Sequence, residues 1–241
     1  VGPPFYHKLI IPFLIPFLLI MAIGPKLKWI KSNLEDKIYL ITLLVVSILL
    51  SILIVKNFSS NFLINTILIS SAFYLFFITL RDFFSKGFKN LAQNTAHFGF
   101  SLLILSILFN NLFSTETITN LKVGETFENA KTKIIFENIS QKQEKNYKSI
   151  IAKFIIQDSK GKIENLSPEL RIYNQPNIVT SEADIKTTLL SDKFIVINLV
   201  PNQELFNVRY QVKPFMLWIW ISVILISVGG LMSFLKKEYE K

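Results

Sequence analysis

The 241-residue chain is 51% hydrophobic, contains 22 Phe and carries a formal net charge of +9. This composition is too apolar for an ordinary soluble domain and indicates a protein that lies largely in lipid. The chain has no Cys, which excludes disulfides, thiolate nucleophiles and Cys-ligated metal sites within it. Any thiol chemistry must therefore come from a partner.

The positive charge is concentrated in short segments and does not form one basic region. Residues 114–213 carry 14 Lys or Arg against 12 Asp or Glu, so this segment is nearly neutral. Most of the other cations fall in three groups: Lys26, Lys28, Lys31 and Lys37; Arg81, Lys86 and Lys89; and Lys236, Lys237 and Lys241. This distribution carries information about membrane topology and argues against nucleic acid as a partner.

Five segments are long and apolar enough to cross a hydrocarbon layer about 30 Å thick, which takes about 20 helical residues. Pro12 and Pro16 should kink the first helix or displace its start toward Pro16. The sequence therefore predicts an α-helical polytopic membrane bundle in contact with the lipid bilayer. The predicted spans lie near residues 9–27, 38–55, 62–80, 92–113 and 215–235.

The basic segments predict the orientation of these spans. The positive-inside rule places residues 26–37, 81–90 and 236–241 in the cytoplasm. Five crossings that begin outside must end inside, which agrees with the basic tail. Residues 114–213 are then expected on the extracytoplasmic face.

Residues 114–213 change to short β-branched stretches broken by turn residues, a pattern typical of a small β-rich domain, either a barrel or a sandwich. Asp158–Gly161 is a plausible hairpin turn. Apolar residues alternate with polar ones over 206–212, as in a strand with one solvated face. The predicted strands are 133–138, 148–157, 162–166, 169–173, 194–200 and 206–212.

The predicted organisation has three parts. Residues 1–113 form a four-helix transmembrane region, and residues 114–213 form the extracytoplasmic β-rich domain. Residues 214–241 form the final transmembrane helix and a cytoplasmic tail. We further expect Gly229-Gly230 to be a helix-packing position, and Phe215, Trp218 and Trp220 to anchor the outer end of the last span.

His97 lies in the apolar run Leu91–Phe113, about two helical turns from its start, where an ionisable side chain is costly and is a functional candidate. A neutral imidazole is a good axial ligand for haem iron. Gly99 would permit a flat macrocycle to approach, and Phe98 and Phe100 could line its pocket. A hydrogen bond to a neighbouring helix, or a place at the membrane interface, explains His97 equally well.

His7, the other histidine, precedes the first span and is expected on the opposite side of the bilayer, so one haem cannot join His7 and His97. An interfacial polar residue is its ordinary explanation, and we leave it unassigned. A bis-His site needs a ligand from upstream sequence or from another subunit. The chain begins with Val1 and not Met, from which we expect an N-terminally truncated sequence.

Arg171 and Tyr173 lie on a predicted strand of the β-rich domain, within Ser167–Tyr173. An exposed Arg and an exposed aromatic ring at this place could meet a protein or an anionic group. A solvated strand face explains both residues equally well.

Several widely spaced stretches resemble the C-terminal part of cytochrome c-type biogenesis protein F, the haem lyase subunit of the cytochrome c maturation system. The resemblance covers nearly the whole chain but only the last third or so of the family, without its tryptophan-rich outer loop and flanking histidines. His7 and the tail 236–241 depart from the family pattern. The matching stretches are Val1–Tyr6, Ala96–Phe100, Pro168–Tyr173, Val208–Pro214, Trp218–Trp220 and Val228–Ser233.

The resemblance implies that the complete protein holds a b-type haem between transmembrane histidines, of which His97 matches one. It implies haem supply by a membrane-tethered haem chaperone and thioether attachment of haem to apocytochrome c, together with other cytochrome c maturation subunits. The site prediction is then His97 as an axial ligand of the haem iron, with Gly99 beside the cofactor. No catalytic residue is assigned, and the chain is not expected to act as an enzyme alone.

The expected location is the bacterial inner (plasma) membrane with the β domain periplasmic, or alternatively the mitochondrial inner membrane. Two other functions fit the same residues. In a transporter or channel subunit, His97 would be a proton or ion relay and no chromophore would be bound. In a membrane-anchored assembly factor, the outer domain would bind protein and His97 would be dispensable.

Overall fold

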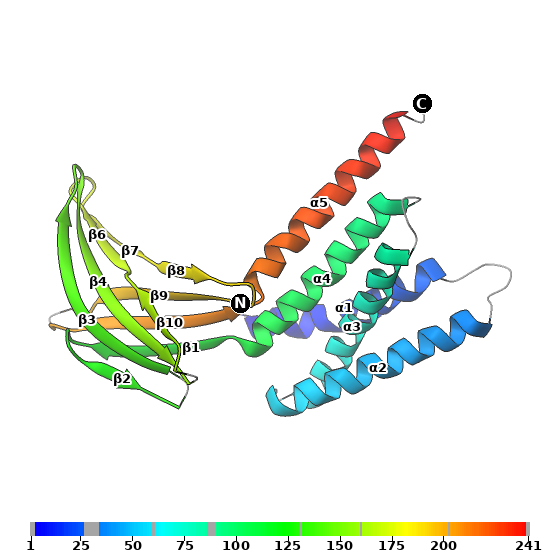
Figure 1. Cartoon of the computed structure of the whole chain (residues 1–241), viewed down its shortest axis with the longest axis horizontal. Helices are drawn as coiled ribbons and strands as arrows, with labels where there is room; N and C mark the ends of the chain where they lie inside the picture. The colour runs from blue at the N-terminus through cyan, green and yellow to red at the C-terminus, as the bar shows by residue number, and fades with distance from the viewer. Residues whose placement is uncertain are drawn as a thin grey trace. The chain divides into compact units, whose positions relative to one another are not determined.

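The computed structural model describes residues 3–26, 34–58, 61–85, 90–130, 132–159, 161–201 and 203–239. The chain divides into two compact units. The helical unit comprises Val1–Phe113 and Trp218–Lys241, and the β unit comprises Ser114–Leu217. The fourth helix continues into the first strand, and the tenth strand continues into the last helix (Figure 1).

Within the described residues, five helices are long and apolar enough to cross a membrane, which confirms the predicted spans. α1 begins at Pro3 and contains Pro12 and Pro16. Of the two predicted outcomes, the displacement of its start toward Pro16 is therefore wrong, and the kink stays a prediction. Local adjustment and neighbouring helices can satisfy the carbonyls that a proline leaves without a donor. The helices are α1 (Pro3–Ile23), followed by the short 3-10 helix η1 (Gly24–Lys26), then α2 (Leu34–Phe58), α3 (Phe62–Ser85), α4 (Leu91–Phe113) and α5 (Met216–Tyr239).

Several polar side chains inside the helical unit have hydrogen-bond partners within it. Ser47 Oγ donates to Leu43 O at 2.7 Å, one turn earlier in the same helix. The hydroxyls of Thr79 on α3 and Ser101 on α4 lie 2.6 Å apart and join the two helices. Because the hydrocarbon layer offers no water, such groups must find partners in the protein.

Glycine allows α4 and α5 to meet at backbone distance. A Cβ atom at Gly229 would lie 2.6 Å from Ala96 N and 2.7 Å from Ala92 O. No atom lies within 4 Å of the corresponding position at Gly230. Of the two glycines predicted to mark a packing position, Gly229 is therefore the one in contact, as in other membrane helix pairs that use small residues.

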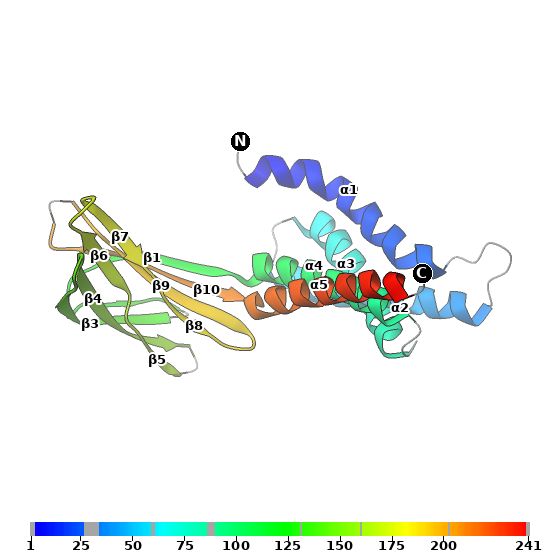
Figure 2. The same cartoon turned by 90° about the horizontal axis from the view of Figure 1, so that it is seen from above.

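The β unit is a sandwich of two antiparallel sheets (Figure 2), which decides between the two predicted architectures. One sheet has the order β1-β10-β9-β8, and the other has β2-β3-β4-β6-β7, with β5 paired to β4. β1, β2, β7 and β8 were not among the predicted strands. The strands are β1 (Thr115–Leu121), β2 (Thr126–Glu128), β3 (Thr132–Gln143), β4 (Tyr147–Asp158), β5 (Ile163–Leu166), β6 (Glu169–Tyr173), β7 (Ile178–Glu182), β8 (Asp184–Thr187), β9 (Ser191–Leu199) and β10 (Phe206–Pro214).

Large apolar side chains from both sheets fill the sandwich. Phe136 and Phe154 stack with ring centroids 4.4 Å apart. Val208 and Tyr210 of β10 point into the same core and Arg209 between them is exposed, as the predicted alternation requires. Gln211 was expected on the solvated face but is buried. Burial raises the pKa of the Tyr210 phenol.

The predicted hairpin turn at Asp158–Gly161 is also confirmed. Gly161 N donates to Asp158 O at 2.9 Å, and Lys162 N donates to Asp158 Oδ1 at 3.0 Å. Gly161 has φ 80°, a left-handed conformation that glycine adopts without steric cost.

Candidate functional site

His97 is partly buried on α4, beside a polar strip that faces α3. Asn94 and Ser101, three and four residues away, share its side of the helix. Asn94 Nδ2 donates to Asp82 O at 3.0 Å, and Ser101 meets Thr79 across the same helix pair. His97 is therefore held next to polar contacts inside a membrane span and is not directed simply to lipid.

The two phenylalanines that flank His97 pack within the helical unit. Phe98 stacks on Phe83 of α3 with ring centroids 5.1 Å apart and an interplanar angle of 26°. Phe100 meets Phe17 of α1 edge to face at 6.1 Å. These rings give His97 an apolar, aromatic neighbourhood, as expected for the surroundings of a membrane cofactor and equally for helix packing.

Gly99 is buried, and α5 covers its open side. A Cβ atom at Gly99 would lie 2.9 Å from both Ile226 N and Leu225 Cβ, and 3.0 Å from Ser222 O. This glycine therefore serves the close approach of α4 and α5. Its contact with a haem stays a prediction, and the packing supplies a structural reason for glycine at this position.

His97 is the one histidine whose side chain the structure describes. The described residues include no group of three or more His, Cys, Asp or Glu able to hold a metal ion. The side chain of His7 lies outside the part of the chain that the structure describes. His97 thus offers one imidazole, and a second axial ligand would have to come from elsewhere.

Two of the cations that predict the topology, Lys26 and Arg81, contact other helices of the helical unit. Lys26 forms an ion pair with Asp82, which joins the end of α1 to the end of α3. The Arg81 guanidinium lies 3.9 Å from the centre of the Tyr39 ring on α2. The basic positions in 27–33 and 86–89 lie outside the described residues.

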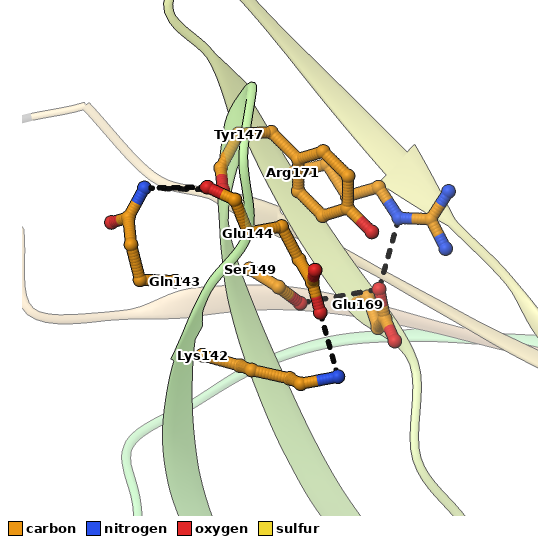
Figure 3. Close-up of polar contacts among 7 residues, drawn as sticks. All are labelled: Lys142, Gln143, Glu144, Tyr147, Ser149, Glu169 and Arg171. Carbon is orange, nitrogen blue, oxygen red and sulfur yellow. Dashed lines mark hydrogen bonds and ion pairs between the residues drawn. The ribbon is translucent and has the colours of Figure 1, made fainter.

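Arg171, singled out from the sequence, belongs to a polar cluster on β4, β6 and the β3–β4 hairpin (Figure 3). Its Nε atom lies 3.0 Å from Glu169 Oε2, which also accepts a hydrogen bond from Ser149 Oγ at 3.1 Å. The Arg171 guanidinium lies 5.2 Å from the centre of the Tyr147 ring. Tyr173 joins the cluster through its ring, 5.2 Å from that of Tyr147.

The charges of this cluster compensate one another. The hydrogen bond that Arg171 donates to Glu169 raises the pKa of Arg171, so the guanidinium stays charged. Glu182 lies 4.0 Å from Arg171 as a second carboxylate. At the hairpin, Lys142 Nζ lies 2.6 Å from Glu144 Oε1, and this contact raises the pKa of Lys142. A pre-paired Arg does not favour an anion site, whereas the partly exposed side chains of Arg171 and Tyr173 suit a protein contact.

Sequence reasoning missed Tyr147, Ser149 and Glu144 as members of this cluster. Tyr147 and Ser149 join it because the first half of β4 pairs with β6, whereas the second half pairs with β5. Glu144 lies in the β3–β4 hairpin and contacts Lys142. No pattern local to 144–149 indicates this change of partner.

Comparison with known proteins gives a consistent match. The family described as "CcmF C-terminal beta-sandwich" matches residues 112–214. The cytochrome c-type biogenesis protein CcmF of Escherichia coli K12 is 24% identical in an alignment that covers 100% of this chain. The CcmF protein of Haemophilus influenzae is 25% identical over 99% of this chain. The chain is thus similar to CcmF proteins over its whole length, and its sandwich matches the C-terminal domain of that family. The resemblance drawn from the sequence is thereby confirmed.

The fold of the chain agrees with its sequence similarity to CcmF proteins. A solved structure titled "Cytochrome c Heme Lyase CcmF" superposes on 95% of the chain with a TM-score of 0.72 at 19% identity. The chain spans about 39% of the length of these two CcmF relatives. Its sequence and fold are therefore similar to one part of these proteins, and both the helices and the sandwich belong to the similar region.

Proposed function

We propose that this chain is the part of a bacterial CcmF-type protein that supplies one axial haem ligand and the sandwich domain for haem attachment to apocytochrome c. The observation that carries the proposal is the position of His97, a partly buried imidazole in a span that matches CcmF along its whole length. A neutral imidazole nitrogen is a suitable donor for haem iron. The residues present thus fit one half of a bis-His site.

In this proposal the residues of the chain bind and orient. His97 would donate a ring nitrogen to the iron, and the second ligand would come from outside the described residues. Phe98 and Phe83 would keep water from that side of the cofactor. The close contact of α4 with α5 at Gly99 would hold the ligand helix in place. A bound b-type haem would supply an iron centre that accepts and releases single electrons.

The orientation and partners follow as proposals. The basic segments support a cytoplasmic end for Lys26 and Arg81, which puts the β unit in the periplasm of a bacterial inner-membrane protein. The partners would be apocytochrome c, a membrane-tethered haem chaperone and other maturation subunits. Labelling of an Asn146→Cys variant by a membrane-impermeant maleimide in intact cells tests the orientation, because a cytoplasmic β unit would not react.

The test of function is an absorption spectrum of the purified complete protein together with a cytochrome c maturation assay. His97→Ala should lose the haem bands and maturation, and added imidazole should restore part of the spectrum. Asn94→Ala is the matched control, since it removes an α3–α4 hydrogen bond one turn away without removing an imidazole. That variant should retain haem.

Two outcomes would contradict the proposal. Normal haem content and maturation in His97→Ala would exclude His97 as a ligand. A wild-type protein without any chromophore would instead favour a proton or ion relay at His97.

A further inference from the structure

The β8–β9 turn, Thr188–Ser191, has two leucines at its centre, unlike the polar β3–β4 and β6–β7 connections. Leu189 and Leu190 are each 69% exposed. Turns in water usually carry Gly, Pro, Asn, Asp or Ser. The β3–β4 and β6–β7 connections follow that rule, with Glu144-Lys145-Asn146 and Asn174-Gln175-Pro176-Asn177.

The turn is well specified by hydrogen bonds. Thr188 N donates to Ser191 O at 3.0 Å, and Ser191 N donates to Thr188 Oγ1 at 3.1 Å. Both bonds close the turn around the two leucines. The hydrogen-bonded backbone therefore keeps both leucine side chains exposed. Adjacent exposed apolar side chains of this kind are typical of sites that contact a membrane or another protein.

The turn lies beside the point at which β10 passes into α5 (Figure 2). Ser191 pairs with Pro214 in the β9–β10 ladder, and Phe215 N donates to Leu190 O at 2.9 Å. Phe215 has φ 60°, a strained value for a bulky residue, and turns the chain from strand to helix. Because the candidate span begins at Met216, the hydrogen bond with Phe215 holds Leu190 next to the first residues of that span.

The surroundings of the turn suit a lipid surface. Phe215 is an aromatic residue at the start of a span, where rings favour the interface. Lys186 on β8 is exposed, and Lys213 on β10 is partly exposed, each within five residues of the leucines or Phe215. Lysines at this depth can place their ammonium groups among lipid phosphates while their stems lie along apolar surface.

We propose that the β8–β9 turn inserts Leu189 and Leu190 into the lipid leaflet on the side of the β unit. The turn is then a second, non-covalent membrane anchor for the sandwich, in addition to its covalent links to α4 and α5. This inference depends on α5 crossing the membrane and is independent of haem binding.

The lack of Cys in the chain allows a direct test. A nitroxide spin label is attached to Leu189→Cys, or to the matched control Asn146→Cys in the polar β3–β4 turn, in the full chain reconstituted in phosphatidylcholine and phosphatidylglycerol vesicles. Power saturation measures collisions with oxygen, which concentrates in the bilayer, and with a water-soluble nickel chelate. Oxygen collisions should dominate at position 189, and nickel collisions should dominate at position 146.

Other results would overturn the anchor. Nickel accessibility at position 189 equal to that at 146 would place the turn in water. A label protected from both reagents, in vesicles and in detergent micelles alike, would show that protein covers the turn. A label on Leu190→Cys gives a second position, so that a folding defect in one variant does not decide the outcome.

Discussion

The interiors of the two units are packed with different kinds of side chain. In the β unit, Phe136 and Phe154 stack inside a core of large apolar residues. In the helical unit, α4 and α5 meet where side chains are missing, at Gly99 and Gly229. Water drives large apolar side chains together in the first case, whereas lipid gives no such advantage and helices gain most from close backbone approach. Side chains and backbone are therefore packed for different physical reasons in the two units.

The largest effect should come from emptying the β core. Phe136→Ala removes a ring that is 0% exposed and should destabilise the β unit by about 3–5 kcal/mol. Hydrogen exchange of β3 and β4 in the reconstituted chain measures the change. Ile163→Ala, at a position 62% exposed in the same unit, is the control and should have little effect. Equal exchange in both variants would show that this core is not tightly packed.

A smaller loss of stability is expected in the helical unit, where the destabilising change is the addition of a side-chain atom and not its removal. Gly229→Ala places a Cβ against the backbone of α4 and should cost about 3 kcal/mol, because backbone cannot move aside as a side chain can. Gly230→Ala meets nothing within 4 Å and should be nearly neutral. Thermal unfolding in detergent micelles compares the two variants. Equal melting temperatures would disprove backbone contact between α4 and α5.

The smallest of the three effects depends on pH. Glu164, 2% exposed on β5, pairs with Lys193 of β9 at 2.8 Å and with Lys162 at 3.0 Å, so it joins the two sheets. Desolvation opposes ionisation of the carboxyl, but the two lysines prevail and hold its pKa below 4.5. Glu164→Gln should cost about 2 kcal/mol at neutral pH.

The sign of the pH dependence follows from the lowered pKa. The stabilisation is present above the unfolded-state pKa near 4.5 and is lost as the pH falls through the lower folded-state value. The difference in melting temperature between wild type and Glu164→Gln should therefore shrink below about pH 4.5. Glu137→Gln, at an exposed position, is the control. A difference that stays constant with pH would mean that the ion pair does not contribute.

Elements were predictable where the signal is local. Unbroken apolar runs matched to bilayer thickness located the spans, and alternation over 206–212 identified β10. β7 and β8 were missed because they are short and carry polar residues on exposed edges. The continuous helix through Pro12 and Pro16 shows that tertiary contacts and local adjustment can override a strong helix-breaking signal.

The candidate site was predicted in part. The cost of an imidazole in an apolar span singled out His97 without any knowledge of the fold. The direction in which Gly99 faces was not predictable, since it depends on how α4 and α5 are rotated about their axes. The partners of Arg171 were equally inaccessible, because Tyr147 and Ser149 reach it only through the β4–β6 register.

Local polarity and segment length were enough to locate the apolar spans, the β-rich region and the partly buried imidazole of His97. Tertiary structure alone decided which residues meet across elements. The contact of Gly229 with Ala96, the ion pair of Glu164 with Lys193 and the place of Leu190 beside Phe215 all depend on helix rotation or strand register. Apolar periodicity indicates which face of a helix or strand is buried, but it does not indicate which other element packs against that face.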